Sequence, residues 1–371
     1  MQERRIASDP YVSFVTFARN DDYAGGLRKL YWSTRYLGEQ CDQAGLTAEA
    51  IIVEWNPPAD REPLAEALRE LSLTPRLAVR IITVPASVHA RYAHAALRPM
   101  HGAIAANVGL RRARGKFLVL KVADAFYPDS LIRFMAAGSL ATDRLYRATR
   151  LDVAADAAEA LGKPKRDFLA HCAQHVVLRN QHLPQPRMPF RLPDLFTNAC
   201  GDFQLLSRER WHQLRGLWES SDVTAFEVDS MLSYSAYAAG IREEMVPEDA
   251  CVYKISHTRS HGHRVAHPDS RLTKLMLIVE AGLRRIGFGN AHVFWLRALF
   301  NYPPKTYSGL RKAVYERSLL RFKLLSLFPS LTRLKSAHWG LATESLAETA
   351  LRGHEEGTEA VRSSFGATNA P

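Results

Sequence analysis

The first 135 residues alternate strand-like and helical patterns, and this alternation constrains the fold more than any other feature of the chain. Four apolar runs of strand type occur here: VSFVTFA (12–18), AIIVEW (50–55), LAVRIITVP (77–85) and KFLVLKVAD (116–124). The segments between them carry apolar residues at helical spacing. Such alternation is typical of an α/β protein whose mostly parallel sheet is flanked by helices on both faces.

The helices of this first part are marked by start and stop signals. LRKLYWSTRYLGEQC (27–41) follows the first strand, and a second helix is expected to begin with Asp60 as its N-cap and Pro63 in its first turn. A third helix over 101–113 is expected to stop at Gly115, before the fourth strand.

The pattern changes after residue 150. Residues 151–195 are Ala-rich and then Pro-rich, and we interpret them as an insertion or a long loop. The pattern predicts regular secondary structure again from the strand DFQLLS (202–207), which is followed directly by a helix capped by Ser207. A helix over 226–240 and a strand around 251–255 follow. This organisation predicts one α/β domain over residues 1–262, followed by a separate C-terminal region.

The charge of the chain is concentrated near its C-terminal end. The 371 residues have a net charge of +11, and residues 305–335 contain eight Lys or Arg against one Glu. Leu and Phe interleave with these charges, so we expect a helical basic region over 263–350. The same pattern fits a helix on an anionic membrane surface and a helix packed on the domain. The low apolar content of 351–371 predicts a disordered tail.

Composition and patterning exclude several classes of protein. The chain is 47% hydrophobic and 23% charged, as in globular proteins, and it has no apolar run of transmembrane length. Its four cysteines are far apart, so neither a disulfide framework nor a zinc ribbon is indicated. Without a signal-peptide pattern, we expect a cytoplasmic protein, with peripheral membrane attachment left open. No nucleic-acid-binding motif accompanies the charge, so no nucleic acid partner is expected.

Polar residues gather where the predicted parallel strands end. Arg19, Asn20, Asp21 and Asp22 follow the first strand, and Asp124 closes the fourth run. The end of the second strand carries Glu54, Trp55 and Asn56. Because ligands of parallel α/β sheets bind at the carboxyl ends of the strands, these residues predict a binding site at that edge.

Several motifs in this order resemble inverting GT-A glycosyltransferases of the family-two-like kind, including a bacterial branch. The resemblance covers roughly residues 10–262, and its motifs are VSFVTFARND, IIVEWNPP, VRIITVP, NVGLRRARGKFLVL, TNACGDFQLLSRERW and FEVDSML. The most specific pattern is N-x-G-x-x-x-A-x-G-x-[FY], formed by Asn107, Gly109, Ala113, Gly115 and Phe117. The resemblance implies a GT-A, Rossmann-like fold and the transfer of a sugar from a nucleotide-sugar donor, UDP- or GDP-linked, to a saccharide or lipid-linked acceptor.

The resemblance also implies roles for particular residues. Asp229 matches the catalytic base, with Glu227 as the other acid of the pair, and Asp202 is expected to contact a substrate sugar or to cap a turn. The donor is expected to contact the following residues: Arg19, Asn20, Asp22, Glu54, Asn107, Arg112, Arg114 and Lys121. Asp124 and His257 match ligands of a Mn²⁺ or Mg²⁺ ion that bridges the diphosphate.

The sequence departs from the family pattern just before Asp124. Lys121, Val122 and Ala123 stand where further acids are expected. Either Asp124 and His257 hold the ion together with the substrate phosphates, or the protein works without metal and cations such as Lys121 or Arg259 take over the charge. Two other functions stay open, namely a nucleotidyltransferase on a related fold and a degenerate GT-A scaffold without activity.

Overall fold

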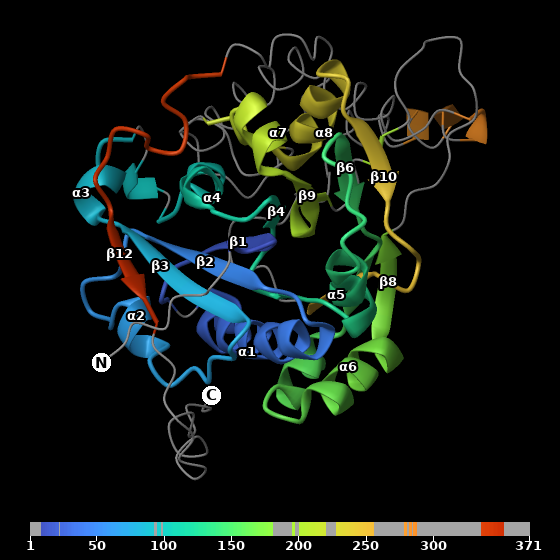
Figure 1. Ribbon diagram of the computed structural model, residues 1–371, viewed down its shortest axis with the longest axis horizontal. Coiled ribbons are helices and arrows are strands. Elements are labelled where there is room, and N and C mark those ends of the chain that lie inside the picture. Colours follow the sequence, from blue (N-terminus) through green and yellow to red (C-terminus); the bar gives the residue numbers. More distant parts are fainter. Residues whose placement is uncertain are drawn as a thin grey trace.

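The structure is a computed structural model that describes most of the first 255 residues and parts of the remainder. The described residues are 9–21, 23–92, 95–97, 99–180, 195–196, 200–219, 228–255, 278–279, 282–283, 285–287 and 335–351. Within these ranges, two sheets and their flanking helices form an α/β fold (Figure 1). The expected fold class, with a mostly parallel central sheet, is confirmed.

The main sheet has eight strands among the described residues, in the order β10-β6-β9-β4-β1-β2-β3-β12. Their bounds are β1 Val12–Ala18, β2 Ala48–Trp55, β3 Leu77–Val84, β4 Phe117–Leu120, β6 Arg144–Arg147, β9 Gln204–Ser207, β10 Arg242–Met245 and β12 Ala347–Ala350. The central strands β4, β1, β2 and β3 are parallel neighbours, whereas β9 and β12 run antiparallel to theirs. The carboxyl ends of the four central strands therefore lie along one edge of the sheet.

The fourth strand is shorter than its sequence run predicts. β4 ends at Leu120, and the four following residues leave the ladder before the short strand β5 begins at Ala125. Asp124 therefore lies in a turn between β4 and β5, and it does not end a strand as expected.

A second sheet of four strands, in the order β5-β11-β7-β8, lies beside the main one. Its strands are β5 Ala125–Phe126, β7 Arg150–Val153, β8 Val176–Asn180 and β11 Val252–Ile255. The interpretation of 151–195 as a long loop is wrong for residues 151–180, which form β7, a 3₁₀ helix, α6 and β8. The sequence pattern did not predict these strands because they are short and pair with segments far away in the sequence.

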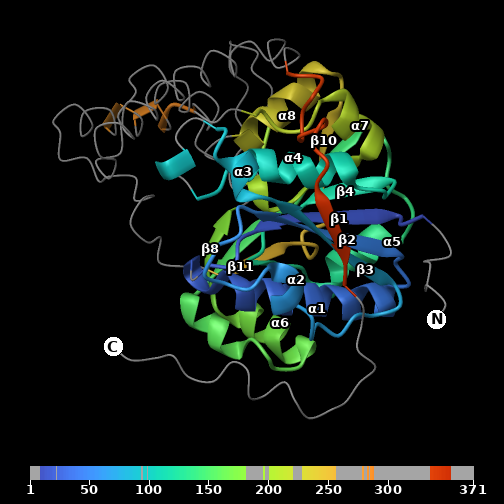
Figure 2. The ribbon, with the colours of Figure 1, turned by 90° about the vertical axis from the view of Figure 1, so that its left-hand side faces the viewer.

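Helices cover both faces of the main sheet, with α4, α7 and α8 on one side and α1 and α2 on the other (Figure 2). The α-helices are α1 Gly26–Ala44, α2 Leu64–Ala67, α3 Ala86–His89, α4 Gly102–Arg112, α5 Asp129–Ala136, α6 Lys165–Gln174, α7 Arg208–Gln213 and α8 Val228–Ala238. The 3₁₀ helices are η1 Tyr23–Gly25, η2 Ala95–Leu97, η3 Ala155–Ala160 and η4 Cys200–Asp202. Ser207 caps α7 as expected, because its Oγ accepts from the N–H of Arg210.

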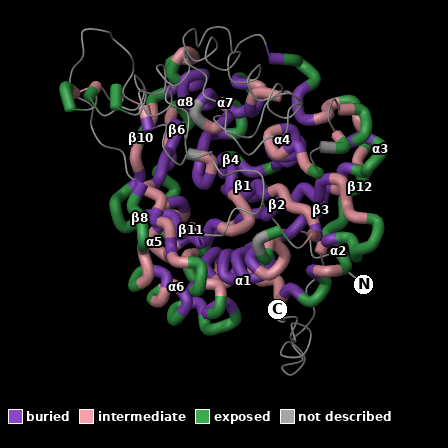
Figure 3. Tube along the Cα trace, turned by 180° about the vertical axis from the view of Figure 1, so that it is seen from behind, coloured by how far each residue is buried: buried purple, intermediate pink, exposed green. Residues whose placement is uncertain are grey.

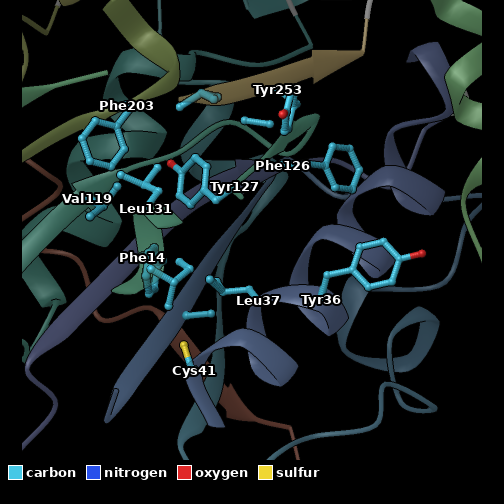
Figure 4. Packing of buried hydrophobic residues seen from close by; sticks show 14 of the residues in the cluster. Phe14, Tyr36, Leu37, Cys41, Val119, Phe126, Tyr127, Leu131, Phe203 and Tyr253 are labelled. Carbon is cyan, nitrogen blue, oxygen red and sulfur yellow. The ribbon is translucent and has the colours of Figure 1, made fainter. Parts of the chain in front are cut away.

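The two faces of the sheet belong to two apolar clusters. Neighbouring residues of a strand point to opposite faces, so Phe14 packs in the cluster on the α1 side and Val15 in the cluster on the α4 side. The central strands and α1 are buried almost throughout, whereas α6 and the turns are more exposed (Figure 3). Figure 4 shows Tyr127 and Phe203 grouped in the α1-side cluster, near the carboxyl end of β4.

Two glycines of the most family-specific motif allow close packing of α4 and the loop that follows it. A Cβ on Gly109 would lie 2.5 Å from Val15 Cγ1, so the helix approaches β1 only because the side chain is absent. A Cβ on Gly115 would lie 2.6 Å from the backbone nitrogen of Ser13. Gly115 does not end α4 in a left-handed turn, because Ala113 is the C-cap in an extended conformation.

Residues 335–351, which we call the strap, pack against α4 and β3 of the domain. Its turns pass beside α4, and its strand β12 pairs antiparallel with β3 (Figure 2). Residues 335–350 are therefore not helical, contrary to the expectation for the basic region, while residues 305–334 lie outside the described ranges. Among the residues that the structure describes, no helix is long and apolar enough to cross a bilayer.

Candidate active site at the carboxyl edge

Charged side chains from both sheets meet where β4 ends and β5 begins. Lys254 in β11 is the register partner of Ala125 in β5 and of Asp152 in β7. This register places Lys254 next to Asp124, and its Nζ lies 3.6 Å from Asp124 Oδ1. The site therefore depends on the pairing of β11 with strands that are more than a hundred residues away in the sequence.

Asp202 is the centre of an ion cluster beside Asp124. Lys254 Nζ donates to Asp202 Oδ1 at 2.7 Å, and Arg150 Nη1 donates to Oδ2 at 2.7 Å. Burial works to lower the pKa of Lys254, but the Asp202 and Asp124 carboxylates outweigh it and raise that pKa. Because cations hold both oxygens of Asp202, this carboxylate is suited to positioning and not to accepting a substrate proton.

Two further lysines lie beside this cluster without a carboxylate partner of their own among the described residues. Lys29 is 5% exposed and Lys121 is 4% exposed. Lys121 Nζ donates to the carbonyl oxygen of Val122 at 3.1 Å. Burial lowers the pKa of Lys121 to about 7, although Asp124 and Asp202 work to raise it, and burial lowers the pKa of Lys29 in the same way.

Asp229, the expected catalytic base, is the second residue of α8 and lies against η4. A Cβ on Gly201 would lie 3.0 Å from Asp229 Oδ2, so the carboxylate rests on the glycine that precedes Asp202. Gln204 Nε2 donates to the backbone oxygen of Asp229 at 2.9 Å and ties α8 to β9. Asp229 is partly exposed, and the N-terminus of an 11-residue helix favours a negative charge at this position.

Arg19 and Asn20 remain at the carboxyl edge and connect β1 to the loop after β2. Arg19 Nε donates to the carbonyl oxygen of Asn56 at 2.8 Å, and Asn20 Nδ2 donates to that of Glu62 at 2.7 Å. Arg19 also pairs with Asp21 at 3.1 Å. Through these contacts both residues hold the loop after β2 against the end of β1. Their predicted contact with the nucleotide stays a prediction.

Glu54 is buried in the protein and does not face the edge. It is 0% exposed, its Oε1 accepts from the N–H of Leu64 at 2.7 Å, and its Oε2 accepts from Thr83 Oγ1 at 3.3 Å. Burial raises the pKa of this carboxyl. Glu54 thereby holds the first turn of α2, whose N-cap is Pro63 and not Asp60 as expected.

Asn107, predicted to contact the donor, organises a loop on the α4 side of the sheet. Its Nδ2 donates to the carbonyl oxygen of Leu217 and to Glu219 Oε1, each at 2.9 Å. Its Oδ1 accepts from the N–H of Leu217 at 2.7 Å. Since both amide protons are used and the residue is 0% exposed, the structure does not bring Asn107 to the site.

Arg112 and Arg114 lie at the opposite edge of the sheet from Asp124, because α4 runs antiparallel to the central strands. The guanidinium of Arg112 donates to the carbonyl oxygens of Gly340 at 2.7 Å and Leu341 at 2.9 Å, both in the strap. The backbone N–H of Arg114 donates to Glu49 Oε1 at 2.5 Å, near the start of β2. Arg112 therefore binds the strap, and Arg114 lies near the start of β2. The structure does not bring either arginine to the carboxyl edge, where a phosphate is expected.

Three predicted site residues, Asp22, Glu227 and His257, lie outside the described residues. Three residues of the site, Lys29, Arg150 and Lys254, were not predicted. The available signal for Lys254 was a lone lysine inside the apolar run VYKIS. Nothing local marks Lys29 or Arg150, because their surroundings come from distant strands.

The described residues do not fit a divalent-metal site. They contain no group of three His, Cys, Asp or Glu side chains that could share an ion. Both carboxylates of the site, Asp124 and Asp202, already face Lys254, at 3.6 and 2.7 Å. A divalent cation between them would be repelled by this ammonium. His257, the other predicted ligand, lies outside the described ranges.

Comparisons with known proteins gave distant structural likenesses alone. No protein-family model and no curated protein matches the chain. A mannosyltransferase from Pyrobaculum calidifontis, in complex with GDP-mannose and Mn²⁺, is 17% identical over 91% of this chain and 80% of its own, with a TM-score of 0.36. A mutant galactosyltransferase 7 from Drosophila, in complex with manganese, UDP-galactose and xylobiose, is 10% identical over 71% of this chain and 79% of its own, with a TM-score of 0.33. Likenesses this distant identify neither a family nor an activity for this chain.

Proposed function

We propose that the chain transfers a sugar from a nucleotide-sugar donor to an acceptor hydroxyl, with inversion at the anomeric carbon. The observation that carries the proposal is that a partly exposed carboxylate, Asp229, lies beside a buried basic cluster at the carboxyl edge of a parallel sheet. Ligands of such sheets bind at this edge. The order of the sequence motifs that resemble GT-A glycosyltransferases supports the same class of reaction.

Asp229 is the base in this proposal. An inverting transfer needs a carboxylate that takes the proton of the acceptor hydroxyl while the hydroxyl oxygen attacks the anomeric carbon. Asp229 is partly exposed at a helix N-terminus, which favours the ionised form that such a base requires. Asp202 lies next to it with both oxygens held by cations, so we assign Asp202 to positioning Lys254 and Arg150.

The leaving group in this reaction is a nucleoside diphosphate, UDP or GDP, and its negative charge needs stabilisation as the glycosidic bond breaks. Basic groups near Asp124 can supply it, and the described candidates are Lys254, 3.6 Å from Asp124, and Lys121, three residues before it in the chain. Arg19 and Asn20, at the end of β1, are the candidates for contacts to the nucleoside.

The cellular setting of the proposal is the assembly of a surface polysaccharide or glycoconjugate. The basic segment 305–335 would attach the protein to an anionic membrane that carries a lipid-linked acceptor. Flotation of the full chain with liposomes tests this attachment. Equal recovery with neutral and with anionic liposomes would contradict it.

Donor turnover tests the proposed function. The full chain is incubated with a panel of UDP- and GDP-linked sugars, with and without candidate saccharide acceptors, and the released UDP or GDP is measured. We expect release from at least one donor and binding of the matching diphosphate in calorimetry. Binding without release from any donor would favour the scaffold alternative, and the absence of any nucleotide binding would contradict the proposal.

A further inference from the structure

The site contains buried ammonium groups that no carboxylate contacts directly among the described residues. Lys254 pairs with Asp202 at 2.7 Å and with Asp124 at 3.6 Å, and the buried Lys121 and Lys29 are close enough to feel the charge of Asp124. Arg150 adds a fourth cation, and its partner Asp152 lies 2.8 Å away and adds a third carboxylate. With Asp229, which lies against Gly201, the site has four cations and four carboxylates, but two of the three lysines have no carboxylate in direct contact among the described residues.

These two lysines are Lys29 and Lys121, because Asp124 and Asp202 both face Lys254. Among the described residues, Lys29 makes no side-chain hydrogen bond or ion pair, and the ammonium of Lys121 donates to one backbone carbonyl. Burying an ammonium without a counter-ion is costly, so two such residues at one place indicate an anion that supplies the missing partner.

The rim of the site is partly exposed to solvent. The side chains of Asp124, Lys254 and Arg150 are between 18% and 20% exposed, whereas Lys29 and Lys121 lie deeper. Lys121 directly follows β4 and Lys29 lies in the first turn of α1, so both amino groups come from elements that meet at the carboxyl edge.

We propose that Lys29, Lys121 and Lys254 form a site that binds the diphosphate of the nucleotide directly, without a bridging divalent cation. The inference rests on the proposed function and specifies how the donor is held. A pyrophosphate diester carries two negative charges and several acceptor oxygens, which match compact ammonium donors. The lysines thus take the place that a metal ion would have, in agreement with the poor fit of the described residues to a metal site.

Nucleotide binding to the full chain tests the inference. Affinities of UDP and GDP, with UMP, GMP and the nucleosides as controls, are measured by calorimetry in EDTA and again with Mn²⁺. We expect the diphosphate to bind in EDTA and Mn²⁺ to change its Kd little. Lys29→Met and Lys121→Met should each weaken diphosphate binding about tenfold or more and leave nucleoside binding unchanged.

Thermal unfolding of the free variants separates a binding role from a structural one. Because each of these substitutions removes a buried charge that has no ion-pair partner among the described residues, both variants should unfold at the wild-type temperature or above it. Lys163→Met, at an exposed lysine, is the matched control and should change neither property.

Each outcome decides a different point. Diphosphate binding that requires Mn²⁺ would overturn the inference and leave the proposed function in place. Binding in EDTA that neither methionine variant weakens would also overturn it. No nucleotide binding under any condition would remove the proposed function itself. Since the metal dependence is measured on the wild type, the test does not depend on the variants being folded.

Discussion

Replacing Asp202 by asparagine keeps the shape of the side chain and removes the charge on which two cations depend. Lys254 and Arg150 each lie 2.7 Å from its carboxylate, and the Asp202 side chain is 5% exposed. Removing one partner of a buried ion pair costs about 3–5 kcal/mol, because the other charge is left uncompensated. Lys254 keeps Asp124 at 3.6 Å and Arg150 keeps Asp152 at 2.8 Å. We therefore expect the lower end of that range, about 3 kcal/mol.

Urea unfolding of the full chain, followed by tryptophan fluorescence, measures this loss. Asp143→Asn is the matched control, because the Asp143 side chain is 53% exposed and pairs with Arg144 at the surface. An exposed pair of this kind contributes about 1 kcal/mol or less. If Asp202→Asn unfolds at the same urea concentration as the wild type, the Asp202 carboxylate does not neutralise the buried cations, and the electrostatic description of the site is refuted.

Three further predictions concern the scaffold and its pH dependence. Gly109→Ala should destabilise the fold by about 1–3 kcal/mol in urea unfolding, because the new Cβ would lie 2.5 Å from Val15 Cγ1; an unchanged midpoint would contradict this packing. Arg112→Met should lower stability through lost contacts to the strap and leave the Kd of UDP and GDP unchanged; weaker binding would restore the phosphate role. Burial lowers the pKa of Lys121 from 10.5 to about 7, so the unfolded chain binds more protons between these values. Wild-type stability should therefore rise with pH from about 7 to about 10, and Lys121→Met should rise less; equal slopes would argue against a depressed pKa.

Much of the fold could be predicted from local sequence signals. β1 matches its apolar run, and Ser207 caps α7 as its position before the helix predicts. These elements are set by periodicity and capping, which act within a few residues. β5 and β12, in contrast, have two and four residues and are formed by pairing with distant strands, so no local pattern marks them.

The candidate site was predictable only in part, for the same physical reason. Asp124, Lys121 and Asp229 could be identified because they follow a buried strand or begin a helix. Lys254 joins them only through the register of β11 with β5, which brings together residues that are more than a hundred positions apart in the chain. The order of residues along the chain does not contain this pairing.

The motif most typical of the family pattern turned out to be structural. Asn107 and Gly109 fit α4 to the loop at Leu217 and to β1, and neither lies at the carboxyl edge. A pattern of this kind reports that helix and sheet pack closely, and it predicts the fold more reliably than the position of a ligand.

Comparison of Asp229→Asn with the wild type tests the central claim most directly, namely that Asp229 is the base of a sugar transfer at this edge. The assay measures the turnover of a productive donor–acceptor pair and, separately, the Kd of the matching nucleoside diphosphate. We expect kcat to fall at least about a hundredfold, the scale of general-base catalysis, and the Kd to stay within about twofold. A variant that turns over at the wild-type rate would contradict it.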